Sequence, residues 1–242
     1  MAEVSKRPER MVFKGRVLFL TEDVSLIRRQ LEGDDLGYDP GLPLMNNIST
    51  DEITPGWVCF YYDETLGRYV YVGMREQAVG QDEVREGGFA VVVSGLSKGC
   101  GSSRETAPYA EKAAGVELVI AQTVEKIYGQ NAQNIGLLTS TDFRLVARIL
   151  RGEEIALAEF TRELDPISQS IVEYGGLFNY NKARLANRVA PPPLETPRRP
   201  MNIVEKIIAR HAFVAAGQIG VDAVRPGDAL SPWPMCAFLT ST

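Results

Sequence analysis

The run Gly99-Cys100-Gly101-Ser102-Ser103-Arg104-Glu105 holds the residues of this chain best suited to chemistry. Its glycines allow a tight turn, and Ser102 with Glu105 has the spacing of a capping box at a helix start. A helix start attracts anions through unpaired N–H groups, and Arg104 adds a forked donor for a carboxylate. An ordinary capped helix after a tight turn would need the same glycine spacing. The segment thus indicates a carboxylate-binding loop beside a serine hydroxyl, or a plain helix cap.

The elements around this loop alternate between strand and helix patterns. Upstream lies the β-branched run 87–94, and downstream come a helical pattern over 103–114 and a strand over 116–121. Further helical patterns cover 123–134, 142–150 and 165–174, the last with Pro166 in its first turn. Strands are predicted at 10–20, and at 57–62 with 68–72 as a hairpin. We therefore expect a mixed α/β fold.

Composition limits the function classes. The chain has 242 residues, 45% of them hydrophobic, and a net charge of −5. Its Lys and Arg residues are scattered, which makes nucleic acid an unexpected partner. The apolar runs are too short to span a bilayer, and the charged N-terminus is unlike a signal peptide. These features predict a cytoplasmic protein that has no membrane partner.

Cysteine and histidine are scarce. The three cysteines, Cys59, Cys100 and Cys236, are widely spaced, so they indicate neither a disulfide framework nor a CxxC metal site. His211 is the single histidine, which disfavours a Ser-His-Asp site or a multi-histidine metal site. We expect this chain to bind no metal by itself.

A second motif supports a specific family. Residues 47–55 read Asn-Ile-Ser-Thr-Asp-Glu-Ile-Thr-Pro, which resembles a Thr-Asp-x-Ile-x-Pro element, although Thr50-Asp51 can also simply cap a turn. The serine run resembles the Gly-x-Gly-Ser-Ser-Arg-Glu signature of the swivel domain in the aconitase and isopropylmalate dehydratase family, including its small-subunit form. The likeness continues through 107–108, 119–121, 127–128 and 134–138. It covers most of residues 10–188.

The resemblance implies a swivelling β/β/α domain and a hydro-lyase reaction on a hydroxy-di- or tricarboxylate, by dehydration and rehydration. By position, Ser102 would be the base, supported by Asp51. Substrate would be bound by Ser103, Arg104 and Thr50, and Arg68 is a further candidate. Many family members have His where this chain has Thr106. The family's [4Fe–4S] cluster is carried by a catalytic large subunit or domain, which is therefore the expected partner.

The chain changes character after the swivel domain, predicted at 1–188. A proline-rich linker is expected at 189–200, followed by a short helical extension whose residues 201–211 and 224–228 resemble the opening of the family's large catalytic subunit. Asn202 and Glu205 have capping-box spacing there. Residues 234–242 do not resemble the family, and a one-base shift in a possible coding sequence restores a family-like continuation. We interpret 201–242 as the truncated start of a catalytic domain.

Two interpretations remain. The chain is the swivel component of an iron–sulfur hydro-lyase acting on a 3-isopropylmalate-like or aconitase-like substrate, or it is a non-catalytic carboxylate-binding or subunit-interaction module. The segment 57–60, Trp-Val-Cys-Phe, can shape a pocket for a nonpolar substrate group or form a buried strand. The missing cluster ligands favour the module for the isolated chain, and the Ser102-Ser103-Arg104 triplet favours the enzyme for the assembled system.

Overall fold

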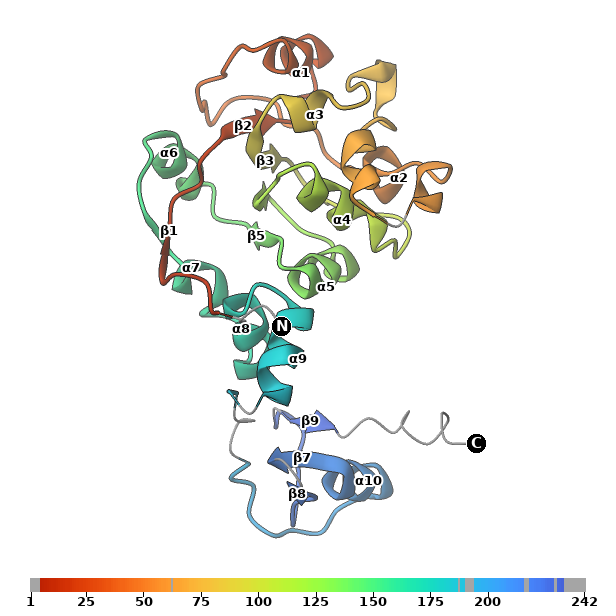
Figure 1. The fold of residues 1–242 in the computed structure, drawn as a ribbon, viewed down its shortest axis with the longest axis vertical. Helices are drawn as coiled ribbons and strands as arrows, with labels where there is room; N and C mark the ends of the chain where they lie inside the picture. The colour runs from red at the N-terminus through yellow and green to blue at the C-terminus, as the bar shows by residue number, and fades with distance from the viewer. Residues whose placement is uncertain are drawn as a thin grey trace.

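A parallel sheet forms the centre of the larger part of the chain (Figure 1). The computed structural model describes residues 5–61, 63–186, 188–189, 194–215, 218–228 and 230–232. The four-stranded sheet has the order β2-β3-β4-β5. These strands are Arg16–Phe19, Phe89–Ser94, Leu118–Ala121 and Leu138–Ser140. Neighbours are parallel, as expected for strands joined by helical crossovers.

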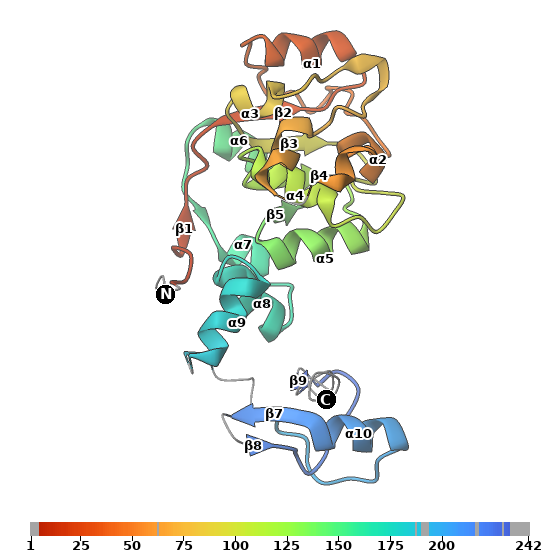
Figure 2. The same ribbon diagram turned by 45° about the vertical axis from the view of Figure 1, so that its right-hand side comes forward.

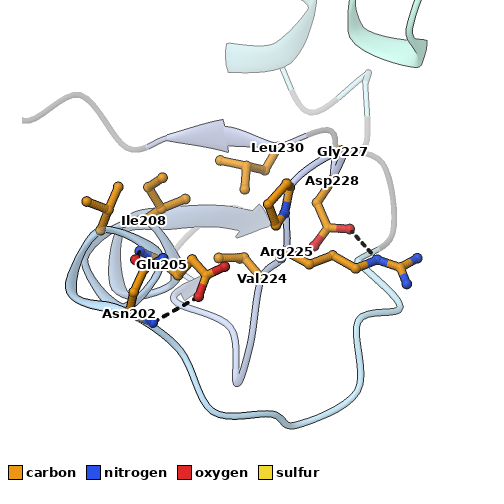
Figure 3. A pocket seen from close by; sticks show the side chains of 10 residues that line it. Asn202, Glu205, Ile208, Val224, Arg225, Gly227, Asp228 and Leu230 are labelled. Atoms are coloured by element: carbon orange, nitrogen blue, oxygen red, sulfur yellow. Dashed lines mark hydrogen bonds and ion pairs between the residues drawn. The ribbon is translucent and has the colours of Figure 1, made fainter.

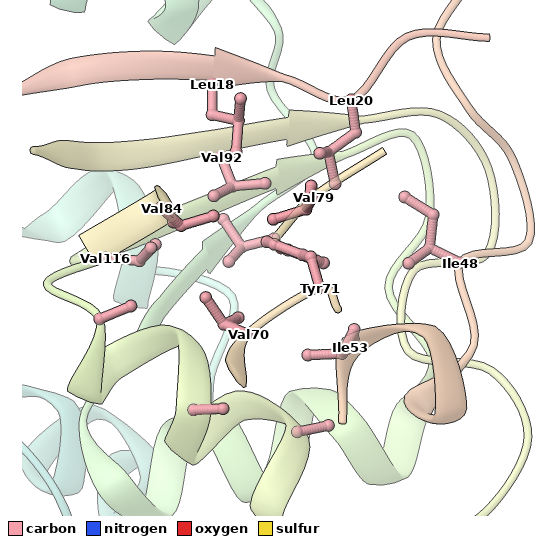
Figure 4. Packing of buried hydrophobic residues seen from close by; sticks show 14 of the residues in the cluster. Leu18, Leu20, Ile48, Ile53, Val70, Tyr71, Val79, Val84, Val92 and Val116 are labelled. Carbon is pink, nitrogen blue, oxygen red and sulfur yellow. The ribbon is translucent and has the colours of Figure 1, made fainter. Parts of the chain in front are cut away.

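Helices cover both faces of this sheet, which confirms the α/β prediction (Figure 2). Between β3 and β4 lies α4 (Thr106–Ala113), and between β4 and β5 lies α5 (Lys126–Ile135). Both pack on one face together with α2 (Thr50–Ile53), around alternate strand residues such as Leu18 and Val92 (Figure 4). The opposite face packs against α6 (Arg144–Leu150). Alternation along each strand therefore supplies two apolar layers.

Smaller elements complete the larger part. A two-stranded antiparallel sheet joins β1 (Arg10–Met11) to β6 (Ile155–Ala156). The remaining α-helices are α1 (Val24–Leu31), α3 (Glu83–Glu86), α7 (Ala158–Thr161), α8 (Pro166–Glu173) and α9 (Leu177–Leu185). The 3-10 helices are η1 (Val58–Phe60), η2 (Glu64–Tyr69) and η3 (Arg75–Gln77).

The hairpin predicted at 57–62 and 68–72 is wrong. The segment forms η1 and η2 instead, and Tyr62 lies outside the described residues. Asp63 accepts a hydrogen bond from the backbone of Thr65, and Leu66 is buried against α4, so turns bury this segment's apolar residues without a strand partner. The spacing of apolar residues in so short a run cannot distinguish a strand from a helical turn. Likewise, the strand expected at 10–20 divides into β1 and β2.

The C-terminal unit contains more than the predicted helix. Helix α10 (Ile203–His211) begins with the expected Asn202–Glu205 capping box. It is followed by an antiparallel sheet of order β8-β7-β9, comprising Ala212–Ala215 (β7), Gln218–Ile219 (β8) and Ser231–Pro232 (β9), which the sequence patterns did not predict. A hollow of about 480 Å³ lies between the start of α10 and residues 224–230 (Figure 3).

The predicted linker belongs partly to this unit. Thr196 donates a hydrogen bond to Asp228 over 2.6 Å, and Arg199 donates to the Val224 carbonyl over 2.7 Å. The proline run 191–193, Cys236 and the segment 234–242 with its proposed frame shift lie outside the described residues. Within the described part of the chain, the structure contains no helix with the length and apolar character needed to cross a membrane.

Candidate functional site

The two sequence motifs meet at the carboxyl end of β3. Residues 95–105, called here the serine loop, leave β3 and lead to α4. The Gly99 N–H donates to the Ile48 carbonyl over 2.8 Å, and the Thr50 N–H donates to the Cys100 carbonyl over 2.8 Å. A parallel bridge therefore joins the Thr-Asp segment to the serine loop. The carboxyl edge of a parallel sheet is a common place for ligand sites.

A short capped helix presents Thr50 and Asp51. Ser49 caps α2 by accepting from the Glu52 N–H over 3.2 Å, while the Glu52 carboxylate accepts from the Ser49 N–H over 2.7 Å. This capping box satisfies donors that a four-residue helix would otherwise leave unpaired. Ser49 is thus the cap, and Thr50 and Asp51 occupy the first turn beside the serine loop.

Thr50 orients the serine predicted as the base. Its hydroxyl lies 3.1 Å from the Ser102 hydroxyl and 3.2 Å from the Ser102 carbonyl. Thr50 is buried while Ser102 is exposed. The Ser102 hydroxyl therefore contacts Thr50 and also remains accessible from solvent. The structure therefore brings these two predicted residues together.

Arg104 links the same two segments. Its Nη1 donates to the Asp51 carboxylate and, over 3.0 Å, to the Thr54 carbonyl. The Arg104 side chain is 28% exposed and that of Asp51 is 63% exposed. In the described part of the chain, both of these bonds leave from Nη1, so Nε and Nη2 are available to a bound carboxylate. Asp51 thus holds the guanidinium at the edge of the loop.

The capping box predicted from Ser102 and Glu105 is wrong. Helix α4 begins at Thr106, and its N-cap Glu105 makes no side-chain capping bond. Ser102 and the exposed Ser103 lie upstream of the helix. The glycines shape the turn instead, because Gly99 and Gly101 have φ values of +80° and +94°. Backbone contacts to the Thr-Asp segment, which are not visible in local sequence, fix the loop.

Thr106 occupies the place where many family members have His. Its hydroxyl lies 3.2 Å from the Thr54 hydroxyl and 3.4 Å from the Cys59 sulfur. This small cluster ties α4 to α2 and η1. The Cys59 sulfur is therefore in contact with the Thr106 hydroxyl.

Metal ligands do not gather in the described ranges. No group of three or more His, Cys, Asp or Glu side chains there could hold a metal ion. Burial, together with the nearby Glu52 and Glu125 carboxylates, raises the pKa of the Cys100 thiol, whereas metal binding requires a thiolate. The described residues therefore do not fit an iron–sulfur cluster.

Arg68 is placed apart from these contacts. It lies in η2, and its guanidinium binds the Asp82 carboxylate with an Nη2–Oδ2 distance of 2.9 Å. The hydrogen bonds of the Arg68 side chain go to Asp82. The other predicted site residues contact each other in pairs, Thr50 with Ser102 and Asp51 with Arg104. A substrate role for Arg68 stays a prediction.

Sequence reasoning missed an ionic group beneath the loop. Lys98 and Glu111 are fully buried, and their Nζ and Oε1 atoms are 2.9 Å apart. Lys98 also donates to the Tyr71 hydroxyl over 2.7 Å, and the Tyr71 and Tyr128 hydroxyls both donate to Glu111. The sequence signal that could have revealed this group is Glu111, an acidic residue on the same face of α4 as buried alanines. Burial lowers the pKa of the Lys98 ammonium and raises those of both tyrosines.

Known proteins share this region. The family model described as the aconitase C-terminal domain matches residues 74–142, which include β3, the serine loop and α4. The methanogen homoaconitase small subunit of Methanothermobacter thermautotrophicus is 38% identical over 148 residues, covering 56% of this chain and 84% of that protein. The chain belongs to the aconitase-type small-subunit family. The recognition of this family's swivel domain from two motifs is confirmed.

Other members of the small-subunit family agree. The isopropylmalate/citramalate isomerase small subunit of Methanocaldococcus jannaschii is 30% identical over 156 residues, covering 58% of this chain and 90% of that protein. A 3-isopropylmalate dehydratase small subunit of Archaeoglobus fulgidus is 36% identical over 140 residues, covering 57% and 74%. These names span several hydroxy acids, so family membership does not select one substrate.

Proposed function

We propose that this chain is the swivel component of an iron–sulfur hydro-lyase that isomerises a hydroxy-di- or tricarboxylate. The single observation that carries the proposal is the joining of Ser102 to Thr50 and of Arg104 to Asp51 at one sheet edge. An anion-binding guanidinium and an exposed hydroxyl lie there in the segment that matches the aconitase C-terminal domain. Relatives named as dehydratase and isomerase small subunits support the reaction class.

In the proposed reaction, Ser102 as an alkoxide takes a proton from the carbon next to a substrate carboxylate. The electron pair of that C–H bond forms a C=C bond, and the hydroxyl on the neighbouring carbon leaves with its own bonding pair. The hydroxide that leaves and the proton held by Ser102 together make up one water. A hydroxide then adds to the carbon that lost its proton, and the Ser102 hydroxyl returns its proton to the neighbouring carbon, which restores the alkoxide. The net change moves one hydroxyl group, and no oxidant or reductant is consumed.

Neighbouring residues have distinct proposed tasks. Arg104 binds a substrate carboxylate through Nε and Nη2, while Asp51 holds the guanidinium plane. Thr50 orients the Ser102 hydroxyl, and Ser103, exposed beside it, donates to the same carboxylate. Arg68 would contribute only after leaving Asp82.

The cluster is proposed to belong to the large-subunit partner, because the described residues of this chain provide no suitable group of ligands. Exposed aromatic side chains in and around η1 suit such a partner or a nonpolar substrate group. Trp57 is 58% exposed and Phe60 is 83% exposed, and the rings of Trp57 and Tyr61 both contact the Tyr69 ring. These aromatic side chains favour a 3-isopropylmalate-like substrate, whose side group is apolar.

We further propose that residues 1–188 act as the swivel domain, joined by 189–200 to a segment related to the opening of the large subunit. The separate sheet of β7, β8 and β9 and the capping box of α10 support an independent second unit. Its exposed Ile203, Val204 and Ile207 are consistent with a surface that a further part of the enzyme covers.

Reconstitution tests the proposed function. The full chain is added to a cognate large subunit that holds its cluster, and hydration of the enoate is followed by absorbance. Ser102→Ala should lower kcat by about 100-fold or more, because a positioned base contributes on that order. Ser170→Ala in α8 is a matched serine control and should leave kcat unchanged. Absence of activity with the unmodified chain would contradict the proposal.

A further inference from the structure

A fully buried ionic cluster lies beneath the serine loop and takes no part in the proposed proton transfer. It consists of Lys98, Glu111, Tyr71 and Tyr128, called here the buried quartet. Each is at most 1% exposed. The ammonium binds the Glu111 carboxylate and the Tyr71 hydroxyl, and it also lies 4.5 Å from the Tyr71 ring centroid. Both tyrosine hydroxyls donate to Glu111, so one carboxylate receives three donors.

Stability alone does not account for these charges. Removing two ions from water costs several kcal/mol each, on the order of what their attraction returns. Apolar side chains of similar volume generally fill such a site without loss of stability. The buried charges lie on a helix whose other buried residues include Ala107, Ala110 and Ala114. A role in selecting one geometry of the surrounding segments therefore explains them better than added stability does.

The quartet joins the first half of the serine loop to the helix that follows the loop. Lys98 directly precedes Gly99 on the β3 side, whereas Glu111 belongs to α4, which the loop enters after Arg104. The backbone of Lys98 is held as well, since its N–H donates to the Thr123 carbonyl and its carbonyl accepts from the Glu125 N–H, both over 2.9 Å. The ion pair thus spans the segment that carries Ser102 and Arg104.

The tyrosines extend this support to other elements. Tyr128 comes from α5, and its ring lies so close to Gly99 that a Cβ there would be 2.2 Å from the ring carbon Cγ. Tyr71 follows η2 with a φ of +65°, a conformation that a bulky residue rarely adopts without strong surrounding contacts. The labelled position of Tyr71 in Figure 4 is inside the core on the α4 face of the sheet.

We propose that the buried quartet is a positioning device for the serine loop, which sets the geometry of Ser102 and Arg104 relative to bound substrate. This inference rests on the proposed function for its catalytic consequence. Lys98 and Glu111 are positioning residues, because they act through the loop and do not touch the reacting atoms. Fixing the distance between Lys98 and α4 restricts the turn that Gly99 and Gly101 would otherwise leave adaptable.

The decisive variant replaces all four residues by apolar ones: Lys98→Met, Glu111→Leu, Tyr71→Phe and Tyr128→Phe. Val146→Ala, in the core on the opposite face of the sheet, is a control for general loss of packing. Hydrogen exchange of the amides of residues 99–105 is measured in the full chain without a partner. We expect exchange to accelerate roughly tenfold or more in the quartet variant and to stay near the unmodified rate in Val146→Ala.

Kinetics with the cluster-bearing large subunit give the second readout. Displacement of Ser102 and Arg104 should lower kcat roughly 10- to 100-fold and raise KM together. Simple loss of folded protein, in contrast, would lower apparent kcat with KM unchanged. A folded quartet variant with unmodified exchange and unmodified kcat and KM would overturn the proposal.

If the quartet variant does not fold, Glu111→Gln, which keeps the side-chain shape but removes the negative charge, decides by the same exchange and kinetic criteria. If the unmodified chain gives no activity with the large subunit, the proposed function fails. The exchange measurement still decides whether the quartet holds the loop.

Discussion

Replacing Gly99 by alanine tests how tightly the serine loop is packed on α5. Gly99 has a φ of +80°, and a Cβ at this position would lie 2.2 Å from Tyr128 Cγ and 2.4 Å from its Cβ. The Tyr128 ring is fully buried and donates its hydroxyl to Glu111, so it cannot turn away without breaking that bond. The substitution therefore combines an unfavourable backbone conformation with a direct overlap.

The two contributions can be separated. The left-handed backbone costs an alanine about 1–2 kcal/mol, and overpacking of a buried site costs about 1–3 kcal/mol more. Gly152 has a similar φ of +71°, but a Cβ added there would have no atom within 4 Å, so Gly152→Ala should show only the first contribution. We expect losses of unfolding free energy of about 2–5 kcal/mol for Gly99→Ala and about 1–2 kcal/mol for Gly152→Ala.

Urea unfolding followed by circular dichroism measures both variants against the unmodified chain. The midpoint for Gly99→Ala should fall by about 1 M or more, given usual denaturant slopes. Equal midpoints for the two alanine variants, within about 0.3 M on the same slopes, would refute the argument that the loop is packed against the Tyr128 ring.

Two further predictions concern titrating groups. Burial raises the pKa of Asp165, but the hydrogen bonds from Ser168 and Ile167 outweigh it and hold the pKa below the ordinary 3.8. The N-cap of α8 thus stabilises the fold above that pH and loses this contribution as the pH falls through the lower, folded-state pKa. Asp165→Ala should cost about 1 kcal/mol at pH 7 and progressively less toward pH 3, measured by urea unfolding at each pH, and a pH-independent loss would contradict this. Burial raises the pKa of the Cys100 thiol above 9.0, so iodoacetamide labelling of Cys100, followed by mass spectrometry, should reach half its maximal rate above pH 9.0, and a midpoint below that value would count against the burial argument.

Local patterns predicted several of the regular elements of the larger part, although not α1, α9 or β5. The β-branched run before the serine loop forms β3, and Asp165 with Pro166 begins α8, because these signals depend on neighbouring residues. The 57–72 region was mispredicted because apolar side chains such as Val58 and Leu66 can be buried by a helical turn as well as by a strand. The start of α4 was misplaced because the serine loop satisfies its backbone groups with Ile48 and Thr50, which are distant in sequence.

The linear order of residues was enough to identify the family and to predict which residues form its site, since Thr50-Asp51 followed by Ser102-Ser103-Arg104 can be read along the chain. How these residues meet depends on the folded arrangement. Parallel pairing places the ends of β3 and β4 at one edge, and α2 is joined to that edge by the bridge between Ser49 and Cys100. Folding also pairs Lys98 with Glu111, because the partner of a buried charge depends on packing across elements rather than on spacing along the chain.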